Sequence, residues 1–373
     1  MKKEFSIYLD AVRFLAACLV VIFHSNQRNI VSDILPASNW GHAAVIVFFV
    51  LSGYVIAYIT CTQENTLKTY AASRLSRIYS MAIPAIVLAI VLDTIGESLT
   101  PAFYVAKTTH DHGLLRVITS LLFVNEFWKI SIMSFSNWPY WSLCYEVWYY
   151  VLFAVWVFAR GRRRVVIFSA ICLMVGPKVL LLAPIWILGV VLYRWRGADN
   201  LPESLAWLLF LLSTVGIVVF TEYKLVEYFS GLLQSWIGAY WLKELSESKG
   251  FIGDYLLAGL VFVNFMAFNC ISHRFSLVFG LVGRPVRFLA GYTFSIYIFH
   301  QPLILFWAAV FNMSPVGYSL YMRVMIATAL SILALCWLIE RHRIEFKKWV
   351  LHKLTRAESI SAVRPLLGAV SSW

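Results

Sequence analysis

The sequence predicts an all-α polytopic transmembrane bundle of about ten spans, and two features of its composition carry that prediction. Hydrophobic residues fill 61% of the 373 positions and charged residues only 13%, about half the charged share of soluble domains. A soluble fold of this length could not bury so much apolar surface and still present a polar exterior. The composition excludes a soluble globular enzyme, a disordered chain, a small disulfide scaffold and a nucleic-acid-binding domain.

Ten apolar runs account for the predicted spans, since a helix needs about 20 apolar residues to cross a bilayer. They lie at 8–27, 43–62, 79–95, 139–159, 165–182, 183–194, 204–221, 255–271, 288–311 and 321–339. The run at 183–194 is short for a complete span. The apolar run at 114–128 is also short and carries Arg116 and Glu126, so we expect it to be interfacial or re-entrant.

Basic residues set the expected direction of the chain, because cytoplasmic loops are rich in Lys and Arg. With the N-terminus inside, most of the 31 Lys and Arg fall inside, including the RGRRR cluster at 160–164 and the tail at 341–364. We therefore expect both termini to be cytoplasmic. Residues 1–345 then form the transmembrane domain and 346–373 a short basic cytoplasmic tail. The net charge of +12 sets orientation and requires no nucleic-acid partner.

The cysteines and the N-terminal apolar run exclude two further kinds of feature, a disulfide or metal site and a cleaved signal peptide. The six cysteines form no CxxC pair, so neither a disulfide framework nor a metal site is expected. The basic start is followed by an apolar run without a convincing cleavage site, which predicts an uncleaved first span and not a signal peptide.

Arg13 and His24 both lie in the first predicted span, where charge is costly enough to mark a functional candidate. They are eleven residues apart, almost three helical turns, so they share one helix face at depths about 16 Å apart. Arg13 lies toward the cytoplasm and His24 toward the outside. The structural alternative is that Arg13 snorkels to the inner headgroups and His24 caps a neighbouring helix.

Glu146 lies in the aromatic stretch WSLCYEVWYY at 141–150, which opens the fourth predicted span. Because that span enters from the outside, we expect Glu146 at about the depth of His24. A carboxylate beside an imidazole raises its basicity and fixes its tautomer, as a general base requires. Alternatively, the two residues form a structural ion pair, and the aromatic residues form an interface belt.

Other small or polar residues inside predicted spans have structural explanations at least as good as functional ones. Ser52 and Gly53 fall near the middle of the second span, where small residues let helices approach closely. Ser295, Tyr297 and His300 share one late span. A single histidine in an apolar helix is more often a satisfied core residue than a ligand.

Arg74 and Arg77 follow the second span on the predicted cytoplasmic side. Residues three apart on a helix face the same way, and two guanidinium groups on one face suit bidentate binding of phosphate. Ordinary positive-inside charge is the alternative explanation.

Five motifs together resemble the acyltransferase-3 family of integral membrane acyltransferases. They are LDAVRFLAACLVVIFH at 9–24, VFFVLSGY at 47–54, RLSRIY at 74–79, WSLCYEVWYY at 141–150 and SIYIFH at 295–300. The first is the Arg-x10-His pattern of the family's first helix. The chain departs from the family at Ser80, where a proline is common, and at 340–342, where Glu-Arg-His replaces a frequent Glu-x-Pro. It resembles the stand-alone members, which lack an appended esterase-like domain.

The resemblance implies a membrane O-acetyltransferase of the bacterial inner membrane. Such an enzyme moves an acetyl group from cytoplasmic acetyl-CoA, a co-substrate, to a hydroxyl of a cell-surface or lipid-linked glycan. It implies His24, oriented by Glu146, as general base or transient acyl carrier. The pantetheine arm of the donor would run along the first helix past Arg13.

The resemblance also implies two groups of binding residues. The donor is expected at Arg74, Arg77 and Ser52. The acceptor is expected at Trp141, Ser142, Tyr297 and His300, where aromatic rings suit sugars. No metal is expected, and the oligomeric state is left open.

Two other classes of protein remain open at the level of sequence. A transporter or flippase of a small solute or lipid-linked sugar also places polar residues inside spans, although no related halves are visible. A non-catalytic subunit of a polysaccharide export complex is the second. Within the enzyme class, the acyl group could be larger than acetyl. The acceptor could be O-antigen, exopolysaccharide, lipo-oligosaccharide, peptidoglycan or a non-sugar such as a macrolide.

Overall fold

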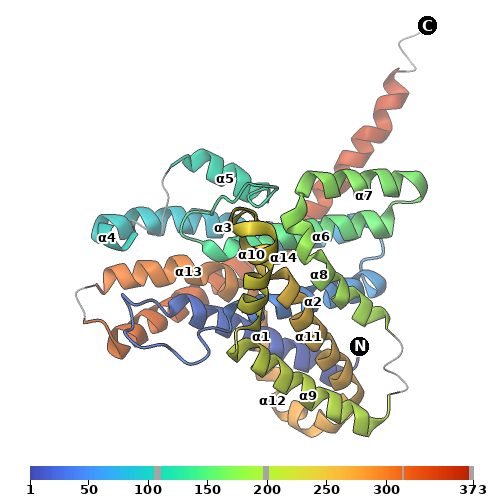
Figure 1. The fold of residues 1–373 in the computed structure, drawn as a ribbon. Helices are drawn as coiled ribbons and strands as arrows, with labels where there is room; N and C mark the ends of the chain where they lie inside the picture. Colours follow the sequence, from blue (N-terminus) through green and yellow to red (C-terminus); the bar gives the residue numbers. More distant parts are fainter. Residues whose placement is uncertain (105–110, 196–200, 313–314, 369–373) are drawn as a thin grey trace.

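The computed structural model describes residues 1–104, 111–195, 201–312 and 315–368, which form helices and no strand. The α-helices are α1 (Lys3–Ser25), α2 (Gly41–Thr62), α3 (Leu67–Leu99), α4 (Pro101–Tyr104), α5 (Gly113–Leu121), α6 (Trp141–Phe158), α7 (Gly161–Val175), α8 (Pro177–Arg194), α9 (Glu203–Glu222), α10 (Leu225–Glu244), α11 (Phe251–Ile271), α12 (Ser276–Gly291), α13 (Thr293–Val310) and α14 (Tyr318–Gly368). Three 3₁₀ turns, η1 (Trp138–Tyr140), η3 (Ser246–Gly250) and η4 (Ser272–Phe275), connect them (Figure 1).

Nine segments of the described chain are long and apolar enough to cross a membrane. They are α1, α2, α3, α8, α9 and α13, with η1 joined to α6, the stretch Ser246–Gly291 and the segment Tyr318–Ile339. The predicted helical membrane bundle is therefore confirmed. The cytoplasmic placement of the termini stays a prediction. The predicted tail at 346–373 continues α14 as far as Gly368, and residues 369–373 lie outside the described part.

The predicted boundary between spans 165–182 and 183–194 is wrong. Helix α7 ends at Val175, and α8 begins at Pro177. Between them Gly176 has a φ of +79°, a conformation that favours glycine, and proline suits the first turn of the next helix. The 15-residue α7 is too short for a full span, whereas α8 runs on through 183–194 as one candidate span.

The run at 114–128 contains only a short helix. Helix α5 has nine residues and is about 14 Å long, so it cannot cross the bilayer. After α5 the chain turns inward, and residues such as Phe123, Glu126 and Asn137 are buried. The loop at 122–137 is thus partly buried, although residues 128–131 in its middle are exposed.

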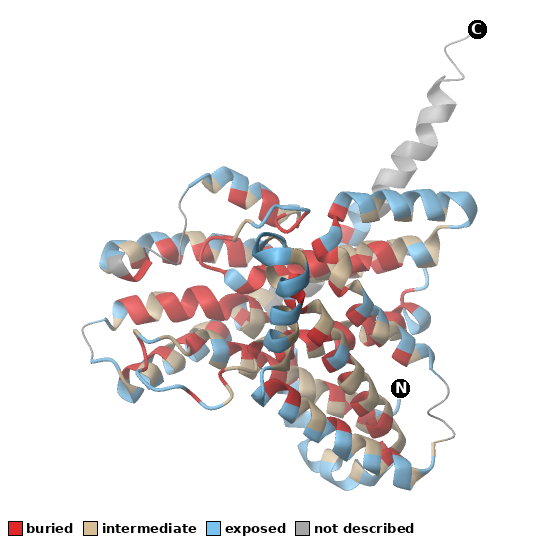
Figure 2. Cartoon of the chain, viewed as in Figure 1, coloured by how far each residue is buried: buried red, intermediate tan, exposed pale blue. Residues whose placement is uncertain are grey.

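The core that positions the site is formed by α1, α2, α3, α6 and α13. Helix α1 packs against α2, α12 and α13, and α13 also packs against α3 and α14. Buried residues gather along these central helices, while α7 and α12 present mostly exposed or half-exposed faces (Figure 2). Apolar exposure on the outer helices is expected where lipid replaces water as the solvent.

Helices α2 and α8 pack closely because each presents a glycine to the backbone of the other. A Cβ on Gly53 would lie 1.9 Å from the carbonyl oxygen of Trp186, and a Cβ on Gly189 would lie 1.9 Å from that of Val50. This agrees with the close-packing explanation of Gly53. Small residues allow such approach between membrane helices.

We expect Gly53→Ala and Gly189→Ala to destabilise the protein by at least about 1–3 kcal/mol, because overpacking against backbone cannot be relieved by rotating a side chain. The control is Gly259→Ala in α11, where no atom lies within 4 Å of the added Cβ, so the change should be neutral or slightly stabilising. The measurement is the melting temperature of the purified protein in detergent. Equal melting temperatures for the three variants would contradict the packing argument.

Candidate active site

One cavity of about 220 Å³ lies among α1, α2, α3, α6, the end of α12 and the start of α13. Seven of the ten site residues that the sequence singles out line it. They are Arg13, Ser52, Arg74, Arg77, Ser142, Glu146 and Tyr297. His24, Trp141 and His300 do not line this cavity. Residues from five separate helices thus converge on one space, which we call the arginine cavity.

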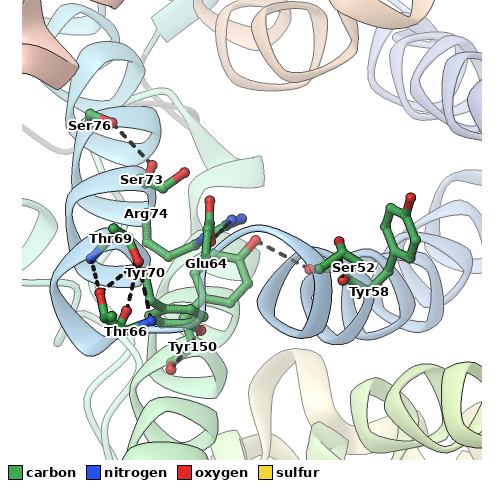
Figure 3. Close-up of polar contacts among 11 residues, drawn as sticks. Ser52, Tyr58, Glu64, Thr66, Thr69, Tyr70, Ser73, Arg74, Ser76 and Tyr150 are labelled. Carbon is green, nitrogen blue, oxygen red and sulfur yellow. Dashed lines mark hydrogen bonds and ion pairs between the residues drawn. The ribbon is translucent and has the colours of Figure 1, made fainter.

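Arg74 is buried at the edge of the arginine cavity and is held by an acid and two aromatic rings. Its Nη2 lies 2.6 Å from Oε2 of Glu64, which precedes α3. Its guanidinium group also lies 5.5 Å from the ring centre of Tyr70 and 5.8 Å from that of Tyr150. Figure 3 shows Glu64, Tyr70 and Tyr150 gathered around Arg74. The side chain is therefore pre-oriented before any ligand binds.

Arg13 and Arg77 supply two further positive charges. Arg13 pairs with Asp10 at 2.9 Å and donates a hydrogen bond to the carbonyl oxygen of Ala290 at 3.2 Å. The guanidinium group of Arg77 lies 5.9 Å from the ring centre of Phe294, and it has no ion-pair partner among the described residues. Arg13 and Arg74 each form an ion pair, and Arg77 is the one of the three arginines that forms none with a described residue.

Glu146 lies among these arginines and accepts two hydrogen bonds. The Ser52 hydroxyl donates one at 2.7 Å and the Tyr150 hydroxyl donates the other. Ser52 in turn accepts a hydrogen bond from Nε1 of Trp186 at 3.2 Å. Because Tyr150 also contacts Arg74, the carboxylate, the tyrosine and the arginine form one network. Figure 3 shows Ser52 reaching Tyr150 from α2.

The expectation that Glu146 lies beside His24 is not met. No hydrogen bond or ion pair joins these two residues, both of which the structure describes, and His24 lies outside the arginine cavity. The candidate span that contains Glu146 begins at Trp138, so Glu146 lies eight residues, or about 12 Å, along it. At that point it shares a cavity with Arg13 and not with His24.

His24 opens onto a second cavity, which we call the histidine cavity. It is lined by Phe23, His24, Gln27, Arg28, Asn29, Met133, Ser136, Trp138 and Gln301. The ring of His24 lies 5.2 Å from the ring of His300, centre to centre. His300 is fully buried, and its Nδ1 lies 3.0 Å and 2.8 Å from the carbonyl oxygens of Ile296 and Tyr297. Since carbonyls only accept, Nδ1 carries the hydrogen and Nε2 is left as an acceptor.

Of the residues expected to bind the acceptor, Ser142 and Tyr297 line the arginine cavity, whereas Trp141 and His300 line neither cavity. The hydroxyl groups of Ser142 and Tyr297 are 2.6 Å apart, and the ring of Tyr297 lies 6.2 Å from that of His300. Trp141 lines neither cavity and packs edge-on against Phe49 and Tyr145. These contacts link the arginine cavity to His24 through α13.

Comparison with known proteins identifies the chain. The acyltransferase-3 family model, described as an acyltransferase domain, matches residues 6–341. The chain belongs to the acyltransferase-3 family. A curated relative, acyltransferase MdmB of Streptomyces mycarofaciens, is 28% identical over 156 residues, which is 40% of this chain and 38% of that protein. The match therefore spans less than two-fifths of the relative's length. No solved structure matches.

In this acyltransferase-3 chain, the arginine cavity is suited to an anion with several phosphate groups. Three guanidinium groups face it from α1 and α3, and guanidinium forks bind phosphate oxygens in pairs. Among the described residues, no group of three or more His, Cys, Asp or Glu is placed to hold a metal ion. The positive charge that could hold an anion there comes from arginine.

Several residues that line the two cavities were not identified from the sequence of this family member. Tyr150 follows Glu146 by four residues, the spacing at which helix side chains meet, so that signal was available. Gln301 follows His300 directly. Ser136 and Trp138 lie in the loop before α6 and in η1, where no periodic pattern marks which side chains face a cavity.

Proposed function

We propose that the protein is a membrane O-acetyltransferase that uses cytoplasmic acetyl-CoA and modifies a hydroxyl of a cell-surface or lipid-linked glycan. The observation that carries the proposal is the arginine cavity, where Arg13, Arg74 and Arg77 face one carboxylate. A donor with several phosphates and a long apolar arm fits a cavity that is cationic at one part and lined by Phe48, Phe49 and other apolar side chains elsewhere.

In the proposed mechanism, the donor phosphates bind Arg74 and Arg77, and the acyl arm extends past Arg13 toward Ser142 and Tyr297. His24 accepts the proton of the acceptor hydroxyl while the hydroxyl oxygen attacks the carbonyl carbon of the thioester. The carbon–sulfur bond breaks, and the proton passes to the leaving thiolate, which gives the ester and free coenzyme A. If His24 instead carries the acyl group, the ester forms in a second step.

Glu146 has a positioning role in this proposal. Its hydrogen bond from Tyr150 fixes a ring that contacts the guanidinium group of Arg74. The same carboxylate offsets part of the positive charge of the cavity. This keeps the arginine side chains together when no phosphate is bound, since like charges close together are unfavourable in a site of low dielectric constant.

We expect the double substitution Arg74→Ala/Arg77→Ala to weaken acetyl-CoA binding by at least about 100-fold. Each hydrogen bond to a charged group contributes about 1.5–3 kcal/mol, and 1.4 kcal/mol corresponds to tenfold in affinity. The measurement is isothermal titration of the purified protein with acetyl-CoA.

The matched control is Arg162→Ala/Arg163→Ala. These arginines are a basic pair at the start of α7, are exposed and line neither cavity, so the affinity should not change. Unchanged binding in the Arg74→Ala/Arg77→Ala protein would remove the donor assignment. Wild-type protein that binds no acetyl-CoA but accumulates a solute in vesicles would favour a transporter instead.

A further inference from the structure

The histidine cavity is a site distinct from the arginine cavity. The two share no lining residue. They nevertheless lie close together along α13, because Ile298 lines the first and Gln301 the second, three residues or about 4.5 Å farther along the helix axis. The buried ring of His300 lies between these two positions in the chain. A molecule in the histidine cavity is therefore adjacent to the end of the proposed donor path.

Two buried polar atoms of the histidine cavity have no hydrogen-bond partner. The Oε1 atom of Gln301 and the Oγ atom of Ser136 are unpaired, although the residues are only 8% and 3% exposed. Nearly all buried polar atoms in proteins are paired. Both residues line the cavity, so a ligand whose hydroxyl groups reach these atoms supplies the missing hydrogen bonds.

Hydrogen bonds hold the loop that carries Ser136 against α3 and α13. The backbone N–H of Ser136 donates to Oδ2 of Asp93 in α3 at 2.9 Å. The side-chain amide of Asn137 donates to the carbonyl oxygen of Ile298 in α13 at 2.8 Å. The loop before α6 is thus tied to the helices on which Gln301 and the rest of the cavity are built.

Trp138 gives the histidine cavity an aromatic wall. Its side chain is 51% exposed, and its indole N–H donates to Oε1 of Glu247 at 3.2 Å, which holds the ring in one orientation. The negative face of an aromatic ring attracts positively polarised C–H groups, such as those on the less polar face of a sugar ring.

We propose that the histidine cavity binds a sugar ring of the acceptor glycan. Trp138 supports the C–H face of the ring, while Gln301 and Ser136 form hydrogen bonds with its hydroxyl groups, and a remaining hydroxyl faces His24. The inference rests on the proposed function, because it gives that reaction its acceptor site. It moves the acceptor from Trp141 and Ser142 to a different set of residues.

The test measures sugar binding without catalysis. The full-length protein in nanodiscs, free of acetyl-CoA, is titrated with a panel of methyl glycosides of common hexoses and amino sugars, and binding is followed by saturation-transfer NMR. We expect at least one glycoside to bind the wild type. We expect Trp138→Ala and Gln301→Leu each to weaken that binding by about tenfold or more, and Trp138→Phe to retain most of it.

The matched control is Trp156→Ala in α6. Trp156 is 52% exposed, almost the same as Trp138, but it lines neither cavity and contacts Phe168 and Arg164. Its loss should leave glycoside binding unchanged. Equal binding by the Trp138→Ala, Gln301→Leu and Trp156→Ala proteins would overturn the inference.

Titration of the same nanodiscs with acetyl-CoA separates the inference from the proposed function. If acetyl-CoA binds but no glycoside of the panel does, the sugar assignment is wrong and the donor site stands. If neither binds, the proposed function fails together with the inference. If glycosides bind in the predicted way but acetyl-CoA does not, the histidine cavity is a sugar site in a protein that is not an acetyltransferase.

Discussion

Purified protein with His24→Ala is expected to transfer acetyl groups about 10²- to 10⁴-fold more slowly than the wild type, the usual contribution of a general base. The affinity for acetyl-CoA should stay unchanged, because His24 lies outside the cavity that holds the three arginines. The measurement is the turnover number with saturating donor, together with a separate binding titration. A lower turnover number with unchanged donor affinity identifies a loss of chemistry.

The control is His273→Ala, which removes an exposed imidazole from η4 that lies outside both cavities. Wild-type turnover in the His24→Ala protein would eliminate the base assignment. An intact-mass measurement after incubation with acetyl-CoA alone distinguishes the two roles of His24. An acetyl adduct that is lost in the His24→Ala protein indicates an acyl carrier, and no adduct indicates a general base.

The partner of His24 in the structure is His300. Its Nε2 atom is buried without a hydrogen-bond partner, and the two rings are 5.2 Å apart. Because two positive charges this close together repel, the pair is suited to holding one proton and not two. The sequence analysis had expected a carboxylate in this place.

What could be predicted from the sequence is what local periodicity determines. Arg74 and Arg77 face one cavity because residues three apart share a helix face, and Arg13 faces the same cavity from α1. The helical bundle follows from composition, since only helices satisfy every backbone group within one apolar segment. Neither inference depends on how the helices pack against one another.

What could not be predicted depends on where the chain turns. The depth expected for Glu146 is wrong because Glu146 lies eight residues into a segment that begins at Trp138, and the irregular loop at 122–137 gives no periodic signal of that start. The break at Gly176 and Pro177 interrupts a continuous apolar run, and a search for long runs passes over it. Trp138 and Ser136 reach the histidine cavity from this irregular backbone. There, position in the sequence does not indicate which side chains point toward a cavity.

The same loop carries a buried ion pair, whose loss is expected to have the largest effect on stability. Nζ of Lys178 in α8 lies 3.2 Å from Oε2 of Glu126, and the two side chains are 1% and 5% exposed. Lys178 also donates to the carbonyl oxygen of Ile130, and Ser131 donates to Oε1 of Glu126 at 3.0 Å. We expect Lys178→Met to destabilise the protein by about 3–5 kcal/mol at pH 9, because it leaves a buried carboxylate unpaired.

The loss of stability in the Lys178→Met protein should depend on pH. The direction of that dependence follows from the pKa of Glu126. Burial raises the pKa of this carboxyl from 4.5 to about 7, while Lys178 and Ser131 oppose the shift. A raised pKa means that the stability contributed by the group is complete below pH 4.5 and is lost as the pH rises through 7. Without Lys178 the pKa of Glu126 rises further, so this loss continues above pH 7.

The Lys178→Met protein should therefore be most destabilised at pH 9 and much less so at pH 6, where Glu126 is mostly neutral and the substitution removes a lysine without a charged partner. Melting temperatures in detergent at the two pH values measure this difference. The double variant Glu126→Gln/Lys178→Met should recover stability at pH 9, since no unpaired charge remains buried. An equal loss at both pH values would mean that Lys178 stabilises the protein through the packing of its aliphatic stem and not through its charge.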